Sequence, residues 1–133
     1  MNIAYLWIAL GGALGSVGRY WLGGLIAEKA GATFPLGTLA VNVTGSFLIG
    51  LFAALHGDQG RAWASPGFRQ FFMVGICGGY TTFSTFSLET LNLAREGEFL
   101  YAGGNVLLSV VLCMIAVWLG WMLGSAFNSM KGN

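Results

Sequence analysis

Charged side chains are scarce in this sequence of 133 residues, where six basic and five acidic residues make up only 8% of the chain. A soluble domain carries roughly 25% charged residues, so this chain could not cover the surface of a soluble globule with polar groups. Hydrophobic residues reach 56%, which excludes an intrinsically disordered chain as well. The composition therefore predicts an integral membrane protein with a single domain, residues 1–133.

Several motifs that carry chemistry or bind charged partners are also absent. The net charge is +1 without a basic cluster, which excludes nucleic acid as a partner, because phosphates demand a row of Lys or Arg. Cys77 and Cys113 lie in apolar segments without CxxC spacing, so we expect neither a cysteine metal site nor a disulfide. His56, the single histidine, ends an apolar segment and is expected at the membrane interface. No Ser/His/Asp set, Cys/His pair or carboxylate pair shares a segment, so the chain is not expected to be an enzyme.

Four apolar segments are long enough to cross a bilayer core as helices, which takes about 20 residues. They run from about Ala4 to Ala27, from Leu36 to His56, from Phe68 to about Ala94 and from Phe99 to Leu123. The pattern predicts an all-α, up-and-down bundle of four transmembrane helices. The first segment lacks a basic leader and is too long for a signal peptide, so no cleavage is expected. Aromatic residues near the segment ends are expected at the membrane interface: Trp7, Trp21, Trp63, Trp118, Trp121, Tyr5 and Tyr101.

Basic residues flank these segments almost evenly, although their excess normally marks the cytoplasmic side. One side would hold Arg61, Arg69 and Lys131, and the other Lys29 and Arg95, with Arg19 near its segment end. Either the chain inserts in both orientations and pairs antiparallel, or a weak bias still gives one topology. Four spans are too few to enclose a wide aqueous path, so we expect an oligomer. Two GxxxG motifs, Gly11/Gly15 and Gly120/Gly124, favour close helix contacts.

Polar residues inside the segments form stripes with helical spacing i, i+4, i+8. The second segment carries Thr38, Asn42 and Ser46, and the fourth carries Asn105, Ser109 and Cys113. Such stripes either line an ion path or join helices by hydrogen bonds. In the first segment Gly11, Gly15 and Arg19 have the same spacing. Arg19 either attracts an anion at a vestibule, or reaches a lipid headgroup or loop carbonyls.

The third segment contains a Gly78-Gly79 pair followed by a run rich in Thr and Ser, which is poor helix material. The pattern predicts a helix break at mid-membrane, where free carbonyls could coordinate a cation, or else a simple kink. Phe83 and Phe86 lie one turn apart and either pack in the core or present positive ring edges to an anion. Thr82, Thr85 and Glu89 share another face. Glu89 is the one carboxylate candidate for coupled transport and lies near a segment end, which favours passive permeation.

The run GGYTTFSTFSLET in the third segment resembles the signature of the Fluc-type (CrcB) fluoride channels, which are four-span bacterial membrane proteins. The stretches GALGSVGRYWLG and PLGTLAVNVTGSFLIG match in order, so the resemblance covers the whole chain. It implies an antiparallel, dual-topology homodimer in the bacterial cytoplasmic (inner) membrane, in contact with lipid and with two fluoride pores. It also implies a structural sodium ion at the dimer centre, bound by backbone carbonyls of Gly78 and Thr81 from each subunit.

The resemblance also assigns residues to the pores. Pore positions match Phe83, Phe86, Asn42, Ser84, Thr85, Ser87 and Thr38, and the polar stripe adds Ser109. Arg19 and Glu89 match vestibule or gating positions, and Asn105 stands where some relatives carry tyrosine. The implied function is passive export of cytoplasmic fluoride, which lowers fluoride toxicity. Two alternatives remain open: a small proton-coupled multidrug or cation exporter, and a membrane scaffold without transport.

Overall fold

The computed structural model describes residues 2–31, 33–57 and 64–132, and all regular secondary structure in these ranges is helical. The helices are α1 (Ile3–Ala30), α2 (Leu36–His56), α3 (Pro66–Arg69), the π-helix η1 (Gln70–Cys77), α4 (Gly78–Tyr80), α5 (Phe83–Arg95) and α6 (Phe99–Lys131). Arg61 and Trp63, for which we expected a role in orientation and an interfacial position, lie outside the described residues.

Within these ranges, three helical stretches are long and apolar enough to cross a membrane: Leu36–His56, Pro66–Arg95 and Phe99–Lys131. Three of the four expected spans are thus found. The remaining helix, α1, has 28 residues, but its glycines and Arg19 dilute its apolar content, so its passage through the membrane stays a prediction. The helix α6 runs eight residues beyond the expected end at Leu123, because no proline or turn signal stops it before Gly132.

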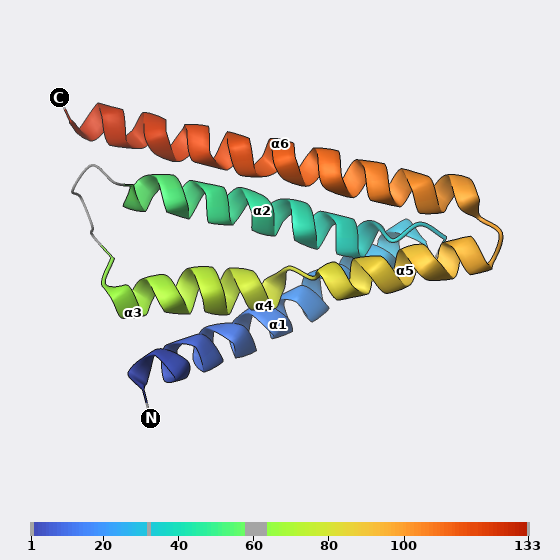
Figure 1. Ribbon diagram of the computed structural model, residues 1–133, viewed down its shortest axis with the longest axis horizontal. Coiled ribbons are helices and arrows are strands. Elements are labelled where there is room, and N and C mark those ends of the chain that lie inside the picture. The colour runs from blue at the N-terminus through green and yellow to red at the C-terminus, as the bar shows by residue number, and fades with distance from the viewer. Residues whose placement is uncertain (1, 32, 58–63, 133) are drawn as a thin grey trace.

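The helices α2 and α6 pack along a seam of glycines. Figure 1 shows α2 between α6 and the line formed by α3, α4 and α5. A Cβ atom at Gly120 would collide with the Phe47 carbonyl oxygen, and one at Gly50 with that of Val117. At Gly124 it would meet Ala54. The second GxxxG motif therefore serves close packing within the chain, as small residues allow in membrane helices.

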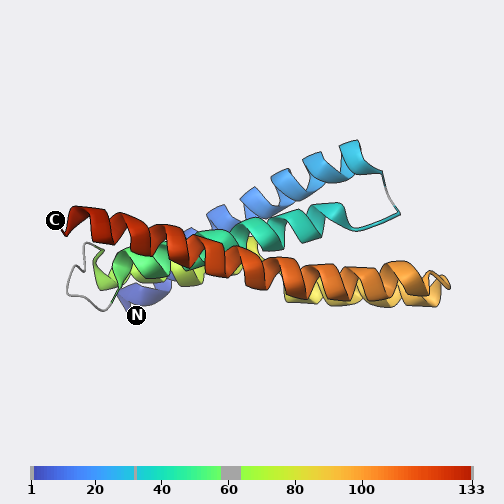
Figure 2. The ribbon, with the colours of Figure 1, turned by 90° about the horizontal axis from the view of Figure 1, so that it is seen from above.

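The first GxxxG motif makes a second seam, between α1 and the third span. Gly11 lies against the backbone of Phe71 and Gly75, and Gly15 lies against the Ile76 carbonyl. Beyond this contact α1 diverges, so that its second half, with the start of α2, stands apart from the α5–α6 hairpin (Figure 2). The divergence leaves room for a cleft at that end of the molecule.

The third span is interrupted, but not at the glycine pair. Gly78 and Gly79 remain helical, and Gly79 packs against the backbone of Gly12, which leaves no room for a side chain. The chain becomes extended at Thr81 (φ −81°, ψ 157°) and Thr82 (φ −151°, ψ 114°), and α5 starts afresh at Phe83. The predicted break is confirmed, and it falls at the start of the Thr- and Ser-rich run that follows the glycine pair.

Candidate ion pathway

The interruption of the third span is closed by one side chain of α2. Asn42 Nδ2 donates to the Thr82 carbonyl oxygen (3.0 Å), and Asn42 Oδ1 accepts from the Thr82 backbone N–H (2.7 Å). The Thr82 hydroxyl caps α5 by accepting from Thr85 N (3.1 Å). A broken helix in lipid must find partners for its freed backbone groups. Asn42 supplies both partners for Thr82, so this asparagine joins α2 to the interrupted span.

A groove opens beside this pair, between α2, α6 and the third span. This central groove has a volume of about 420 Å³. Its lining includes Asn42, Ser46, Thr82, Phe83, Phe86 and Ser109. Cys113 also lines it, so two residues of each polar stripe face a common space, Asn42 and Ser46 from α2 with Ser109 and Cys113 from α6. The groove brings together four of the eight residues that the sequence assigned to a pore: Asn42, Phe83, Phe86 and Ser109.

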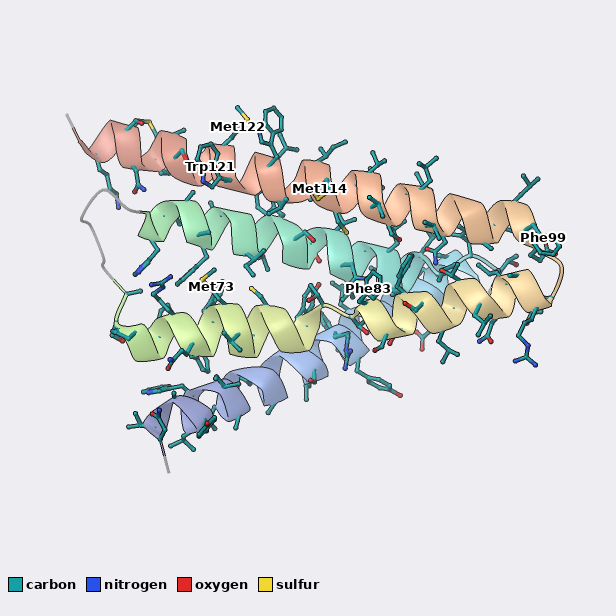
Figure 3. The ribbon with its side chains drawn as sticks, viewed as in Figure 1. Met73, Phe83, Phe99, Met114, Trp121 and Met122 are labelled. Atoms are coloured by element: carbon teal, nitrogen blue, oxygen red, sulfur yellow. The ribbon has the colours of Figure 1, made fainter. Side chains whose placement is uncertain are left out.

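The two phenylalanines stand in different environments at the groove. Their ring centroids are 5.3 Å apart with an interplanar angle of 50°. Phe86 is only 8% exposed, whereas Phe83 is 78% exposed and its side chain is seen at the start of α5 in Figure 3. Core packing thus describes Phe86, and Phe83 presents its ring to the surroundings of the chain.

A second hollow, the outer cleft, has a volume of about 750 Å³ and lies where α1 and α2 diverge from α5. Arg19, Thr38, Thr82, Thr85 and Glu89 are among its lining residues. Thr38 Oγ1 donates to Glu89 Oε1 (2.8 Å), while Glu89 Oε2 is buried without a hydrogen-bond partner. Thr82 lines both hollows, so the Asn42–Thr82 pair stands where they meet.

With this geometry in view, comparison with known proteins decides the family. Residues 6–121 match the family model described as CrcB-like protein, Camphor Resistance (CrcB). The chain belongs to this family. It is 56% identical to the fluoride-specific ion channel FluC of Methylocella silvestris over 96% of this chain and 98% of the relative. Proteins of the same name from Rhodospirillum rubrum (61% identity, covering 89% of this chain and 92% of the relative) and Opitutus terrae (58%, 97% and 98%) are similarly close. These relatives are ion channels and not enzymes, as predicted for this chain.

We expected Asn105 to stand at one end of a pore, but in this CrcB protein its side chain is buried between helices. It is 2% exposed, donates through Nδ2 to Thr90 Oγ1 (2.9 Å) and accepts from Ser109 Oγ (3.4 Å). The hydroxyl of Thr90 in turn donates to the Phe86 carbonyl oxygen (2.8 Å). Sequence reasoning missed Thr90, although its spacing of i+4 from Phe86 was a usable signal.

The remaining pore predictions for this CrcB protein fall on the outward face of α5. Ser84 and Ser87 are exposed and line neither hollow. Ser87 Oγ donates to the Phe83 carbonyl oxygen (2.9 Å), and the Ser84 hydroxyl lies 3.3 Å from that of Thr82. Within one chain neither residue borders a hollow, and their role in a pore stays a prediction.

The residues expected at the sodium site suit a hard cation but do not complete a site. Gly78 and Thr81 both line the central groove. The Thr81 N–H and hydroxyl both donate to the Cys77 carbonyl oxygen (3.0 and 2.9 Å), and no described hydrogen bond reaches the Thr81 carbonyl. Carbonyl oxygens are ligands for hard cations. Two of them from one chain are too few for a cation shell, so sodium binding at Gly78 and Thr81 stays a prediction.

Proposed function

We propose that this chain is a fluoride-selective channel that exports cytoplasmic fluoride passively. The observation that carries the proposal is the central groove, where polar residues of α2 and α6 meet the Phe83–Phe86 pair. Relatives named fluoride-specific ion channels, at 56–61% identity, support the choice of ion. Hydrogen fluoride crosses lipid as a neutral molecule and dissociates inside, so a passive path lets the trapped anion leave along its gradient.

The groove offers the donors that a dehydrated anion requires. An asparagine amide has two N–H donors, and Asn42 uses one on Thr82, which leaves one for the groove. Ser46 adds a hydroxyl donor, and aromatic rings present positive edges. Ser109 also lines the groove, but its hydroxyl proton is donated to Asn105 Oδ1. Fluoride, the smallest halide, is matched by such close donors, whereas larger halides are excluded by fit.

A second copy of the chain would close the groove and complete the pathway. In one chain the groove is open, and Phe83 is 78% exposed beside it. We propose an antiparallel homodimer with both orientations in the bacterial inner membrane and two pores, each sharing residues of both copies. The near balance of basic residues on the two sides supports dual topology.

A sodium ion between the two copies would join the interruptions of their third spans. Gly78 and Thr81 would hold it through their backbone carbonyls, with the same pair from the partner copy. The ion would supply positive charge where both chains interrupt a helix. Thr81 is held in place by its two bonds to the Cys77 carbonyl, which occupy both Thr81 donors.

The outer cleft would serve as the mouth of the path. Arg19 lines it and would raise the local concentration of anions. Glu89 is held by Thr38 within the same cleft and would partly offset that field. A proton-coupled exporter is not favoured, because the relatives are named as channels.

Fluoride efflux from liposomes that contain the purified protein tests the proposal. Potassium-loaded vesicles with valinomycin supply the counter-ion flow, and a fluoride electrode records release. We expect fast fluoride release and little chloride release. Release that requires an imposed pH gradient would instead support a coupled exporter, and no release from folded protein would contradict a transport function.

A further inference from the structure

Three hydrogen bonds lead from α6 into the backbone of α5 at Phe86. The Ser109 hydroxyl donates to Asn105 Oδ1 (3.4 Å). The Asn105 amide donates to Thr90 Oγ1 (2.9 Å), and the Thr90 hydroxyl donates to the Phe86 carbonyl oxygen (2.8 Å). A threonine hydroxyl has one proton. Thr90 therefore donates its single hydrogen bond to the Phe86 carbonyl oxygen and accepts the Asn105 N–H with an oxygen lone pair. All three bonds run in the same direction, which favours mutual polarisation.

Three residues of this series of hydrogen bonds are buried, which restricts the partners that they can find. Asn105 is 2% exposed, and Ser109 and Phe86 are each 8% exposed. A buried amide that loses its hydrogen-bond partner still bears the full free-energy cost of desolvation. Asn105 therefore cannot turn its amide into the central groove unless another group takes the place of Thr90 as its partner. The Asn105 amide therefore joins α6 to α5 through its hydrogen bond to Thr90, although Asn105 belongs to the polar stripe of the fourth span.

Phe83 lacks such a link to a second helix. Its carbonyl oxygen accepts from Ser87, which lies on the same helix and is exposed. Phe86 is connected to α6 through Thr90, whereas no described hydrogen bond connects Phe83 to another helix. The structure thus anchors one ring of the pair from within the chain.

We infer that Asn105 is a positioning residue for Phe86, which sets the rotation and register of α5 against α6 through Thr90. The inference rests on the proposed function, in which the Phe86 ring lines the ion path. Asn105 then controls the width of the groove between Phe86 and Ser109, and through it the choice between fluoride and larger anions. It does so without touching the ion.

A double-mutant cycle in the liposome assay tests this role. Thr90→Val removes the hydroxyl at nearly constant shape, and Asn105→Leu removes the amide at similar size. We expect each variant, and the double variant, to lower fluoride flux by the same factor of about five, because loss of one buried hydrogen bond corresponds to about a factor of 2 to 10. The fluoride-to-chloride ratio falls with it, and Thr90→Ser recovers most of both. Ser129→Ala, an exposed α6 variant whose hydroxyl bonds only Ser125, serves as the control.

A transport-independent readout separates this inference from the proposed function. 4-Fluorophenylalanine placed at position 86 or 83 reports each ring by ¹⁹F NMR. We expect Thr90→Val and Asn105→Leu to shift the resonance at 86 more than that at 83, because the link to α6 enters α5 at Phe86. No shift at 86, or flux losses that multiply in the double variant, would overturn the positioning role. If the unsubstituted protein gave no fluoride flux, the proposed function would fail, and the NMR shifts alone would decide the positioning role.

Discussion

Asn42 of α2 pairs with the backbone of Thr82 through two hydrogen bonds, of 3.0 and 2.7 Å, as a neighbouring peptide group would. The pair closes the interruption of the third span and separates the central groove from the outer cleft. One side chain thereby determines both how the helix is broken and where the two hollows meet.

Replacement of this asparagine should therefore affect stability and flux together. Asn42→Leu leaves the Thr82 N–H and carbonyl unpaired, and each unpaired buried group costs about 1–3 kcal/mol. We expect a clearly lower melting temperature in detergent and loss of fluoride efflux. Asn92→Leu, an exposed asparagine of α5, is the matched control and should melt like the parent protein. Equal melting of both variants would contradict the role given to Asn42.

The glycine seams predict opposite outcomes for the same substitution. Gly50→Ala places a methyl group against the Val117 carbonyl and should destabilise the fold by about 1–3 kcal/mol through overpacking. Gly104→Ala, where the site is open, should be neutral or stabilise α6 by up to about 1 kcal/mol. Thermal unfolding monitored by circular dichroism compares the two. Similar melting temperatures would show that the α2–α6 contact is looser than described.

Substitutions at the two phenylalanines should have different effects, one on stability and the other on fluoride flux. Phe86 is buried, so Phe86→Ala should cost about 3–5 kcal/mol of stability. Phe83 is exposed in the single chain, so Phe83→Ile should leave the chain folded while fluoride flux falls sharply. Circular dichroism and liposome efflux on the same preparations provide the comparison. Unchanged flux in Phe83→Ile would remove the ring-edge contribution to the path.

A central sodium site predicts a cation-dependent dimer. A ligand that binds only the dimer stabilises the dimer. Once the ligand concentration exceeds the dissociation constant, this stabilisation grows with the logarithm of the concentration. We expect dimer stability, followed by chemical cross-linking or native mass spectrometry, to rise with sodium at constant ionic strength. N-methylglucamine should not replace it. A dimer indifferent to sodium would argue against the carbonyls of Gly78 and Thr81 as ligands.

The positive charge of Arg19 should raise the fluoride concentration in the outer cleft. Arg19→Gln should raise the fluoride concentration needed for half-maximal flux, and the difference from the parent should shrink as ionic strength rises, because salt screens exposed charge. Lys29→Gln, a cation of α1 outside the outer cleft, is the control. An effect of Arg19→Gln that is independent of salt would indicate a structural role.

The sequence predicts the bounds of α2 correctly, because Pro35 and Gly57 mark the two ends of a continuous apolar run. The break was predicted over the glycine pair and the Thr- and Ser-rich run after it, and within that stretch Thr81 and Thr82 leave the helix. The glycine pair stays helical, because Gly79 is packed against Gly12. Asn42 and Thr82 are 40 residues apart, so no local pattern could indicate their pairing. Asn105 shows the same limit: helical spacing places it on a stripe, but only the position of Thr90 in space turns it toward α5.

The π-helix η1 sets a limit on how the chain can vary. Its eight residues face two ways: Phe71, Gly75 and Ile76 pack against α1, while Met73 and Cys77 border the groove. An added or deleted residue in a helix rotates everything beyond it by about 100°. Such a change between Pro66 and Gly75 would turn Gly75 away from Gly11 or swing the threonines that follow away from Asn42. The length of this stretch is therefore constrained as strictly as its composition, and natural insertions and deletions should accumulate in other parts of the chain.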